Sequence, residues 1–130
     1  MSKKLLDIDE EIQLIVLEKT IKTLAAELGM SIVNQTKLMT AARELGRNMI
    51  LYGRGGTVTV DVWPGTTKPG IRLVFADQGP GIPNLEVALQ DGYSSGQGLG
   101  LGLPGTKRLV DEFHIESTVG RGTTVTITKW

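Results

Sequence analysis

Two polar side chains that are four positions apart, Glu44 and Asn48, form the first candidate site in this sequence. In a helix such positions share one face and lie about 40° apart around the axis. The carboxylate could serve as a base, and the amide oxygen could bind a hard cation such as Mg²⁺, which prefers oxygen ligands. The alternative is an ordinary surface glutamate that pairs with Arg43 or Arg47.

A second candidate site begins at Asp77, which follows the apolar run at 71–76 and precedes Gly79, Pro80 and Gly81. A carboxylate at the end of a strand can accept a hydrogen bond from an exocyclic amine. Glycines, which have no Cβ, allow a flat ring to approach the backbone. Because Asp, Gly and Pro are also common turn residues, a plain turn is the alternative.

Glycines are concentrated in a third segment, between Gly79 and Gly105. The chain has 17 glycines in 130 residues, about 13%, against a usual share of about 7%. Gly98, Gly100 and Gly102 lead into a predicted helix, where successive backbone amides suit a phosphate group. The spacing matches neither the Rossmann fingerprint nor the P-loop. A flexible connector is the alternative.

Thr123 and His114 are the remaining polar candidates. Thr123 opens the last predicted strand, where its hydroxyl could reach a buried polar ring, although threonine is also a common strand residue. His114 is the one histidine of the chain and lies at a predicted junction between helix and strand. We expect a structural role for it.

The composition excludes several classes of function. The 14 basic and 14 acidic side chains cancel, so the chain has no overall positive charge to attract nucleic acid or an anionic membrane. It has no cysteine, which excludes disulfides and thiolate metal sites and suits a reducing cytoplasm. No long apolar run or signal peptide is recognisable. We expect one domain over residues 1–130, cytoplasmic, that binds neither nucleic acid nor membrane.

The elements that must position these residues follow from the hydrophobic periodicity. Helices are predicted over about 9–28, 34–52, 85–89 and 103–113, with Gly29 and Gly53 ending the first two. Strands are predicted over about 5–8, 57–63, 71–76, 114–118 and 123–129. This order predicts an α+β fold, a two-layer sandwich in which helices cover one face of a mostly antiparallel sheet. The apolar positions expected to face the core are Ile12, Ile15, Val16, Ile21, Leu24, Ala25 and Leu28 in the first helix and Leu38, Ala41, Ala42, Leu45, Met49 and Tyr52 in the second.

Four motifs occur in a fixed order over residues 34–128: Glu-x-x-x-Asn, Asp-x-Gly-x-Gly, Gly-x-Gly-x-Gly and Gly-Thr. In this order they resemble the GHKL superfamily, the ATP-binding fold of gyrase, the ninety-kilodalton heat-shock chaperone, mismatch-repair ATPases and histidine kinases. The resemblance implies the histidine-kinase-like ATPase fold, with ATP and Mg²⁺ as ligands. It also implies roles for single residues: Glu44 as the base, Asn48 for Mg²⁺, Asp77 for the adenine amine, Gly79 and Gly81 for the adenine edge, Gly98, Gly100 and Gly102 for the phosphates, and Thr123 for adenine through water.

Within that superfamily the chain resembles the small bacterial serine/threonine kinases of partner-switching systems, in particular the stressosome switch kinases. The segments that carry this resemblance are 35–38, 41–45, 51–53, 91–93 and 102–113, together with the final Trp130. The resemblance implies an ATP- and Mg²⁺-dependent protein serine/threonine kinase. Its implied substrates are STAS-domain proteins, the stressosome scaffold and antagonist, and its implied further partner is a downstream phosphatase or cyclase regulator.

The alternative function is an anti-sigma factor type of binding module that sequesters a sigma factor, with phosphorylation secondary. Some related anti-sigma kinases carry an arginine in the glycine-rich segment, but residues 93–97 contain no basic side chain. Lys107 and Arg108 are therefore the candidates for contact with the γ-phosphate.

Overall fold

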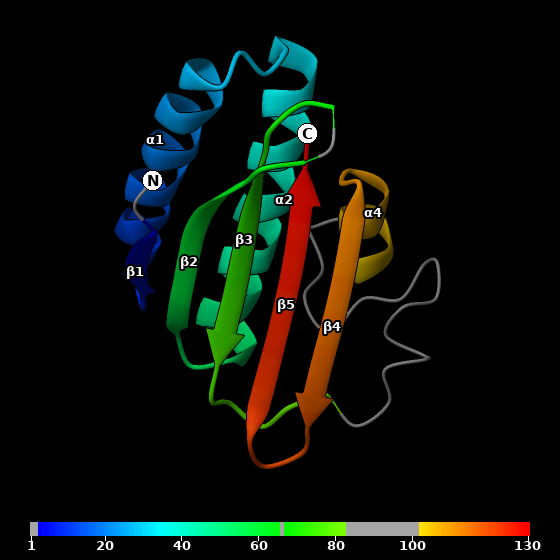
Figure 1. Ribbon diagram of the computed structural model, residues 1–130. Coiled ribbons are helices and arrows are strands. Elements are labelled where there is room, and N and C mark those ends of the chain that lie inside the picture. Colours follow the sequence, from blue (N-terminus) through cyan, green and yellow to red (C-terminus); the bar gives the residue numbers. More distant parts are fainter. Residues whose placement is uncertain (1–2, 66, 83–101) are drawn as a thin grey trace.

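The computed structural model describes residues 3–65, 67–82 and 102–130, which form two layers (Figure 1). One layer is a five-stranded sheet in the order β1-β2-β3-β5-β4, with every neighbouring pair antiparallel. The helices lie on one face of this sheet, so the predicted α+β sandwich is confirmed. The strands are β1 (Lys4–Ile8), β2 (Gly56–Trp63), β3 (Gly70–Asp77), β4 (Glu112–Thr118) and β5 (Gly122–Lys129), and the helices are α1 (Glu11–Glu27), α2 (Ile32–Tyr52) and α4 (Gly102–Arg108).

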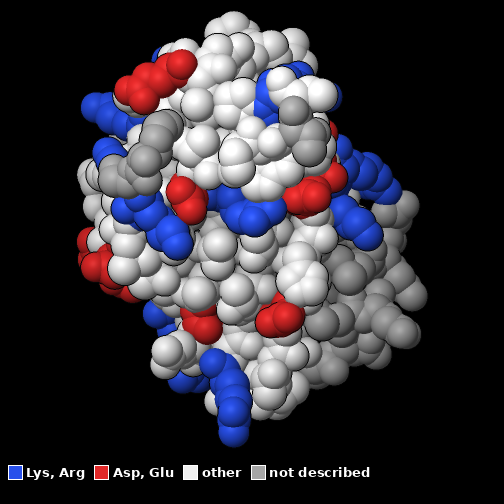
Figure 2. Space-filling view, in the orientation of Figure 1, with Lys and Arg blue, Asp and Glu red and all other residues white. Residues whose placement is uncertain are grey.

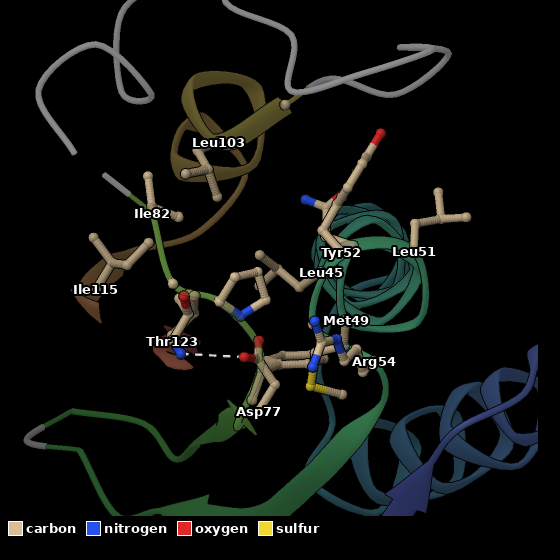
Figure 3. A pocket seen from close by; sticks show the side chains of 17 residues that line it. Leu45, Met49, Leu51, Tyr52, Arg54, Asp77, Ile82, Leu103, Ile115 and Thr123 are labelled. Carbon is tan, nitrogen blue, oxygen red and sulfur yellow. Dashed lines mark hydrogen bonds between the residues drawn. The ribbon is translucent and has the colours of Figure 1, made fainter. Parts of the chain in front are cut away.

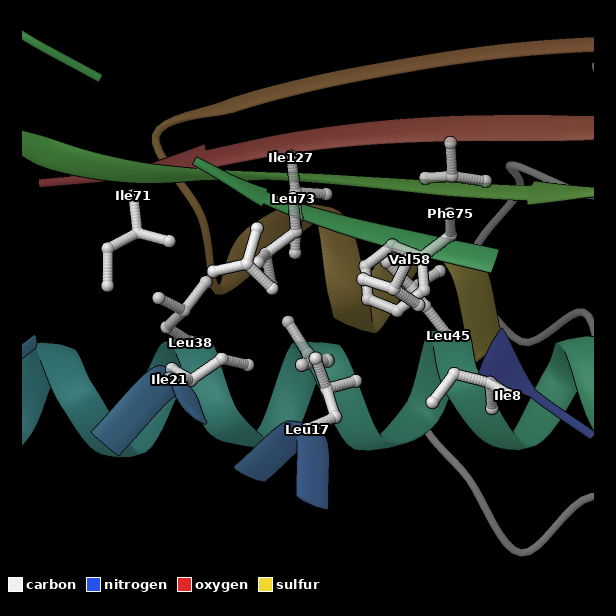
Figure 4. Packing of buried hydrophobic residues seen from close by; sticks show 14 of the residues in the cluster. Ile8, Leu17, Ile21, Leu38, Leu45, Val58, Ile71, Leu73, Phe75 and Ile127 are labelled. Atoms are coloured by element: carbon white, nitrogen blue, oxygen red, sulfur yellow. The ribbon is translucent and has the colours of Figure 1, made fainter. Parts of the chain in front are cut away.

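The hydrophobic core fills the space between the sheet and the helices (Figure 4). Val58 of β2 is opposite Phe75 of β3, and Leu73 of β3 is opposite Ile127 of β5. Because side chains alternate between the two faces of a strand, these residues all point toward the helices. They bury their side chains against Leu38 and other residues of α2. This packing fixes the position of α2 over the centre of the sheet.

The opposite face of the sheet is not covered by helices, and Figure 2 shows charges of both signs across it. Arg72 of β3 donates from Nε to the Thr128 hydroxyl at 3.0 Å and pairs with Glu112 at 3.3 Å. Basic and acidic side chains are both present on this surface, so it has no single sign of charge. No helix in the described part of the chain is both long and apolar enough to span a membrane.

The first helix buries a different face from the predicted one. Ile12, Ile15 and Val16 are 66%, 53% and 51% exposed, whereas Leu14 and Leu17 are buried. Residues 14–17 are all apolar, so the spacing could not determine which side packs against the sheet. The prediction was correct for the second half of α1 and its C-cap Leu28, where Ile21 and Ala25 are buried and Leu24 and Leu28 are partly buried.

Several predicted boundaries were wrong by one to five residues. The N-cap of α1 is Glu10 rather than Asp9, and α2 begins at Ile32 rather than near Asn34. The helix predicted to reach Phe113 ends at Arg108, because the chain turns there and the Asp111 amide already donates to the Thr128 carbonyl beside β4. Tyr52, predicted for the core, is 39% exposed. The helix predicted at 85–89 lies outside the described residues.

Ser31→Ala is expected to lower the free energy of unfolding by about 1 kcal/mol. The Ser31 hydroxyl accepts a hydrogen bond from the Asn34 amide at 3.1 Å and so caps α2. Urea denaturation would measure the change, with Ser31→Asp as the control that retains a capping oxygen. Equal stability of Ser31→Ala and the parent protein would show that the cap is not needed.

Candidate functional site

A cavity of about 480 Å³ opens between the C-terminal half of α2, the ends of the central strands and the start of α4 (Figure 3). Its volume lies within the range of about 300–1,000 Å³ that is common for small-molecule sites. Most of its walls are apolar, and a few polar groups converge on it. The lining includes Leu45, Asn48, Met49, Tyr52 and Arg54 from α2 and the turn after it, Phe75 and Asp77 from β3, Gly81 and Ile82 from the following segment, Gly102 and Leu103 from α4, and Ile115, Thr123 and Val125 from β4 and β5.

Asp77 is held at the end of β3 by two backbone donors. Its Oδ1 atom accepts hydrogen bonds from the Gly79 amide at 2.9 Å and from the Thr123 amide at 3.2 Å, the second of which is dashed in Figure 3. Within the described residues, no hydrogen bond reaches the second carboxylate oxygen, Oδ2. The site therefore offers one acceptor oxygen in a fixed orientation to a ligand in the cavity.

Glycines allow the backbone to pack tightly around this carboxylate. A Cβ on Gly53 would lie 2.6 Å from the Asp77 carboxylate carbon, and a Cβ on Gly79 would lie 2.7 Å from the Gly53 Cα. Gly81 has a φ of +80°, a left-handed conformation that side chains rarely adopt. The turn after α2 and the segment after β3 are thus in direct backbone contact, and this contact fixes the position of Asp77.

Ser117 contributes to the site although the sequence did not predict it. Its hydroxyl lies 2.8 Å from the Thr123 hydroxyl and accepts a hydrogen bond from the Ile82 amide at 2.7 Å. Ser117 and Thr123 are opposite each other in the β4–β5 ladder. No local sequence signal could identify Ser117, because this contact exists only once the two strands have paired. Ser117 connects Thr123 to the segment that follows Asp77.

The two candidates on α2 are placed differently. Asn48 lines the cavity, whereas Glu44, one helical turn earlier and partly buried, is not part of the lining. The two arginines considered as partners for Glu44 form ion pairs with α1: Arg43 with Glu18, and Arg47 with Glu11 at 3.8 Å. The structure therefore brings Asn48 and Asp77 to one cavity and leaves Glu44 beside it.

The remaining predicted residues divide into three groups. Gly102 lines the cavity at the start of α4 with a φ of +69°, and Gly98 and Gly100 lie outside the described residues. Lys107 and Arg108 are exposed in the last turn of α4 and are not part of the lining. His114 is exposed on β4, 3.2 Å from Glu116 and outside the cavity.

The donor atoms near the cavity limit how a cation could bind. Among the residues that the structure describes, no group of three His, Asp or Glu side chains could hold a metal ion. Asn48 supplies one amide oxygen. Mg²⁺ commonly binds through one or two protein ligands together with substrate phosphates and several waters. The donor set at the cavity therefore fits Mg²⁺ that arrives with a phosphate-bearing ligand.

The chain belongs to the family described as histidine kinase-, DNA gyrase B- and HSP90-like ATPases, which matches residues 25–130. Serine/threonine-protein kinase RsbT of Bacillus subtilis (strain 168) is 42% identical over 109 residues, which cover 84% of this chain and 82% of that protein. Anti-sigma F factor of Thermoanaerobacter sp. (strain X514) is 30% identical over 112 residues, which cover 82% of this chain and 77% of that protein. The GHKL resemblance and the enzyme class predicted from the sequence are confirmed by these relationships.

Solved structures show the same fold. The crystal structure of the RsbU and RsbW domains of Rv1364c from Mycobacterium tuberculosis matches with a TM-score of 0.67 and 19% sequence identity. The match covers 99% of this chain and 32% of that chain. The mycobacterial sensor histidine kinase MprB matches with a TM-score of 0.58 and 19% identity, over 98% of this chain and 97% of that chain.

Proposed function

We propose that the protein is an ATP- and Mg²⁺-dependent serine/threonine kinase that phosphorylates a protein partner, with ATP bound in the cavity beside α2. The observation that carries this proposal is the geometry of Asp77. Two backbone amides hold its Oδ1 atom, and its Oδ2 atom is left to accept a hydrogen bond from the exocyclic amine of adenine. Membership of an ATPase family and the similarity to a named serine/threonine kinase support the same function.

The walls of the cavity suit a purine ring. Met49 from α2 and Ile115 and Val125 from the sheet provide apolar surface, and Gly81 lines the same cavity. Gly79 and Gly81 are proposed to contact the adenine edge through their backbone, since the space that a side chain would need at these positions is filled by Gly53 and Thr118. Thr123, whose hydroxyl is already oriented by Ser117, would reach the ring through water. Shape and one fixed acceptor together would select adenine.

The phosphates would extend from the adenine site toward Asn48 and the start of α4. Gly98, Gly100 and Gly102 are proposed to hold them through backbone amides. The Asn48 side-chain oxygen would bind Mg²⁺, which neutralises charge on the triphosphate during transfer. This arrangement leaves the γ-phosphate at the side of the cavity nearest Glu44.

Glu44 is proposed to act on the acceptor hydroxyl. As the serine or threonine oxygen bonds to the γ-phosphorus, the bond from that phosphorus to the bridging oxygen breaks and ADP leaves. The hydroxyl proton passes to the Glu44 carboxylate. The acceptor reaches Glu44 from outside the nucleotide cavity, in agreement with the absence of Glu44 from the cavity lining.

Asn48→Ala is expected to weaken ATP binding in Mg²⁺ by about tenfold, toward the affinity measured in EDTA. Asn48 is the one residue with a side-chain amide among the α2 residues that line the cavity, and the substitution removes that group. Titration calorimetry with and without Mg²⁺ would measure the change, and Asn34→Ala at the other end of α2 is a matched control. If the ATP affinity of Asn48→Ala still fell from Mg²⁺ to EDTA by as much as that of the parent protein, another residue would have to be the metal ligand.

The proposed substrates are STAS-domain proteins of a stressosome or another partner-switching pathway, and the proposed further partner is a downstream phosphatase or cyclase regulator. The proposed location is the cytoplasm, where ATP would be available. Similarity to anti-sigma F factors favours a second candidate function, the sequestration of a sigma factor. Pull-down of STAS-domain proteins and sigma factors of the same organism, with and without ATP and Mg²⁺, would separate the two. Capture of a sigma factor alone would contradict the kinase pathway.

A further inference from the structure

Arg54 is the one non-glycine residue with a left-handed backbone among the residues that the structure describes, with a φ of +63°. It follows Gly53, the C-cap of α2. The position after a helix C-cap is often left-handed and is usually occupied by glycine, because a side chain is unfavourable there. Folding alone would favour glycine at position 54. The arginine side chain therefore suggests a functional reason for this residue.

The two glycines that flank Arg54 fix the position of the turn. The amides of Gly53 and Gly55 both donate to the Met49 carbonyl, at 2.9 Å and 2.8 Å. A Cβ on Gly53 would meet the Asp77 carboxylate at 2.6 Å, and a Cβ on Gly55 would meet Asp9 Oδ1 at 2.3 Å. The Arg54 side chain thus starts from a tightly packed turn next to Asp77.

The Arg54 side chain is available for a ligand. It lines the same cavity as Asp77, and Figure 3 shows both at one end of the view, with Leu103 of α4 at the other. Arg43 and Arg72 each pair with a glutamate, whereas within the described residues no acidic group lies within ion-pair distance of Arg54. A guanidinium is planar and packs well on the face of an aromatic ring.

We propose that Arg54 is a nucleotide-binding residue whose guanidinium packs against the adenosine part of ATP. The inference rests on the proposed function, because it requires adenine at Asp77. Gly53, the neighbour of Arg54, is in contact with the Asp77 carboxylate, so Arg54 lies at the adenine end of the cavity. Arg54 is therefore expected to contact the nucleoside. Its contribution to binding affinity should be the same for ATP, ADP and adenosine.

Arg54→Gly tests this inference because it moves stability and affinity in opposite directions. The thermal midpoint of unfolding is expected to rise by about 2–5 °C, since glycine suits the left-handed backbone. Affinity for ATP is expected to fall by about 5- to 30-fold. Arg54→Lys retains the charge and the unfavourable backbone but has no planar group, so it should recover only part of the affinity.

Arg121→Gly is a matched control, because Arg121 is also an exposed arginine between two glycines but does not line the cavity. It should leave affinity unchanged. Titrations with ATP, ADP and adenosine, followed by nuclear magnetic resonance of the labelled protein, should show the same fold loss in Arg54→Gly for all three ligands.

Unchanged affinity in Arg54→Gly, full recovery by Arg54→Lys, or a loss confined to ATP would each overturn the inference. If the parent protein binds ATP and Arg54→Gly binds it equally well, the inference alone fails. If the parent protein does not bind ATP, the proposed function fails together with the inference.

Discussion

Glu44→Gln is expected to slow phosphoryl transfer by about 10²- to 10⁴-fold while changing the affinity for ATP by no more than about twofold. Glutamine retains the shape of the side chain but cannot accept the proton of the acceptor hydroxyl. Because Glu44 lies one turn before Asn48 on α2 and outside the cavity lining, its replacement leaves the nucleotide contacts intact. The variant should therefore bind both ATP and the partner and fail at transfer.

The rate of label transfer from γ-labelled ATP to the partner would measure this effect, and titration calorimetry would measure binding. Glu27→Gln, at the end of α1 and exposed, is the matched control and should transfer at the parent rate. Equal rates for Glu44→Gln and the parent protein would remove Glu44 from the mechanism. A parallel loss of ATP affinity would make Glu44 a binding residue instead.

Asp77→Asn is expected to weaken ATP binding by about 5- to 150-fold. The amides of Gly79 and Thr123 both donate to one side-chain oxygen, and the asparagine oxygen can accept from both. The asparagine NH₂ group then takes the place of Oδ2 and faces the adenine amine, so that two donors oppose each other. The fold should persist, because the two hydrogen bonds to the backbone are retained.

Titration calorimetry with ATP would measure this loss, and circular dichroism would verify that the variant is folded. Asp61→Asn makes the same chemical change on β2, at a position that does not line the cavity, and should leave affinity unchanged. Parent affinity in Asp77→Asn would show that Asp77 does not recognise adenine.

The sequence predicted the fold well where the pattern of apolar residues had a single period. The alternation at 57–63 identified β2, the apolar run at 71–76 identified β3, and the stripe along α2 identified most of its buried residues. In the first half of α1 the apolar residues surround the helix, and only packing against α2 and the sheet selects Leu14 and Leu17. At the end of α4 the predicted helix competes with pairing to β5, and the pairing prevails from Glu112 onward.

The residues of the candidate site could be predicted from the sequence where they belong to a local sequence motif. Asn48 belongs to a motif within α2, and Asp77 and Gly81 belong to one run that begins at the last residue of β3. The structure brings all three to one cavity. Ser117 and Arg54 could not be found in this way. Ser117 acts through strand pairing, and the significance of Arg54 depends on a backbone angle that the sequence does not reveal.

The proposed function requires that the protein transfers the γ-phosphoryl group of ATP to a protein hydroxyl. The most direct measurement is incubation of the purified protein with γ-labelled ATP, Mg²⁺ and STAS-domain proteins of the same organism, followed by acid treatment and mapping of the labelled residue. We expect an acid-stable label on a serine or threonine of the partner that is lost without Mg²⁺ and is reduced, at low ATP concentration, with Asp77→Asn. A partner that binds in the presence of ATP and Mg²⁺ but carries no label on serine or threonine would contradict the claim.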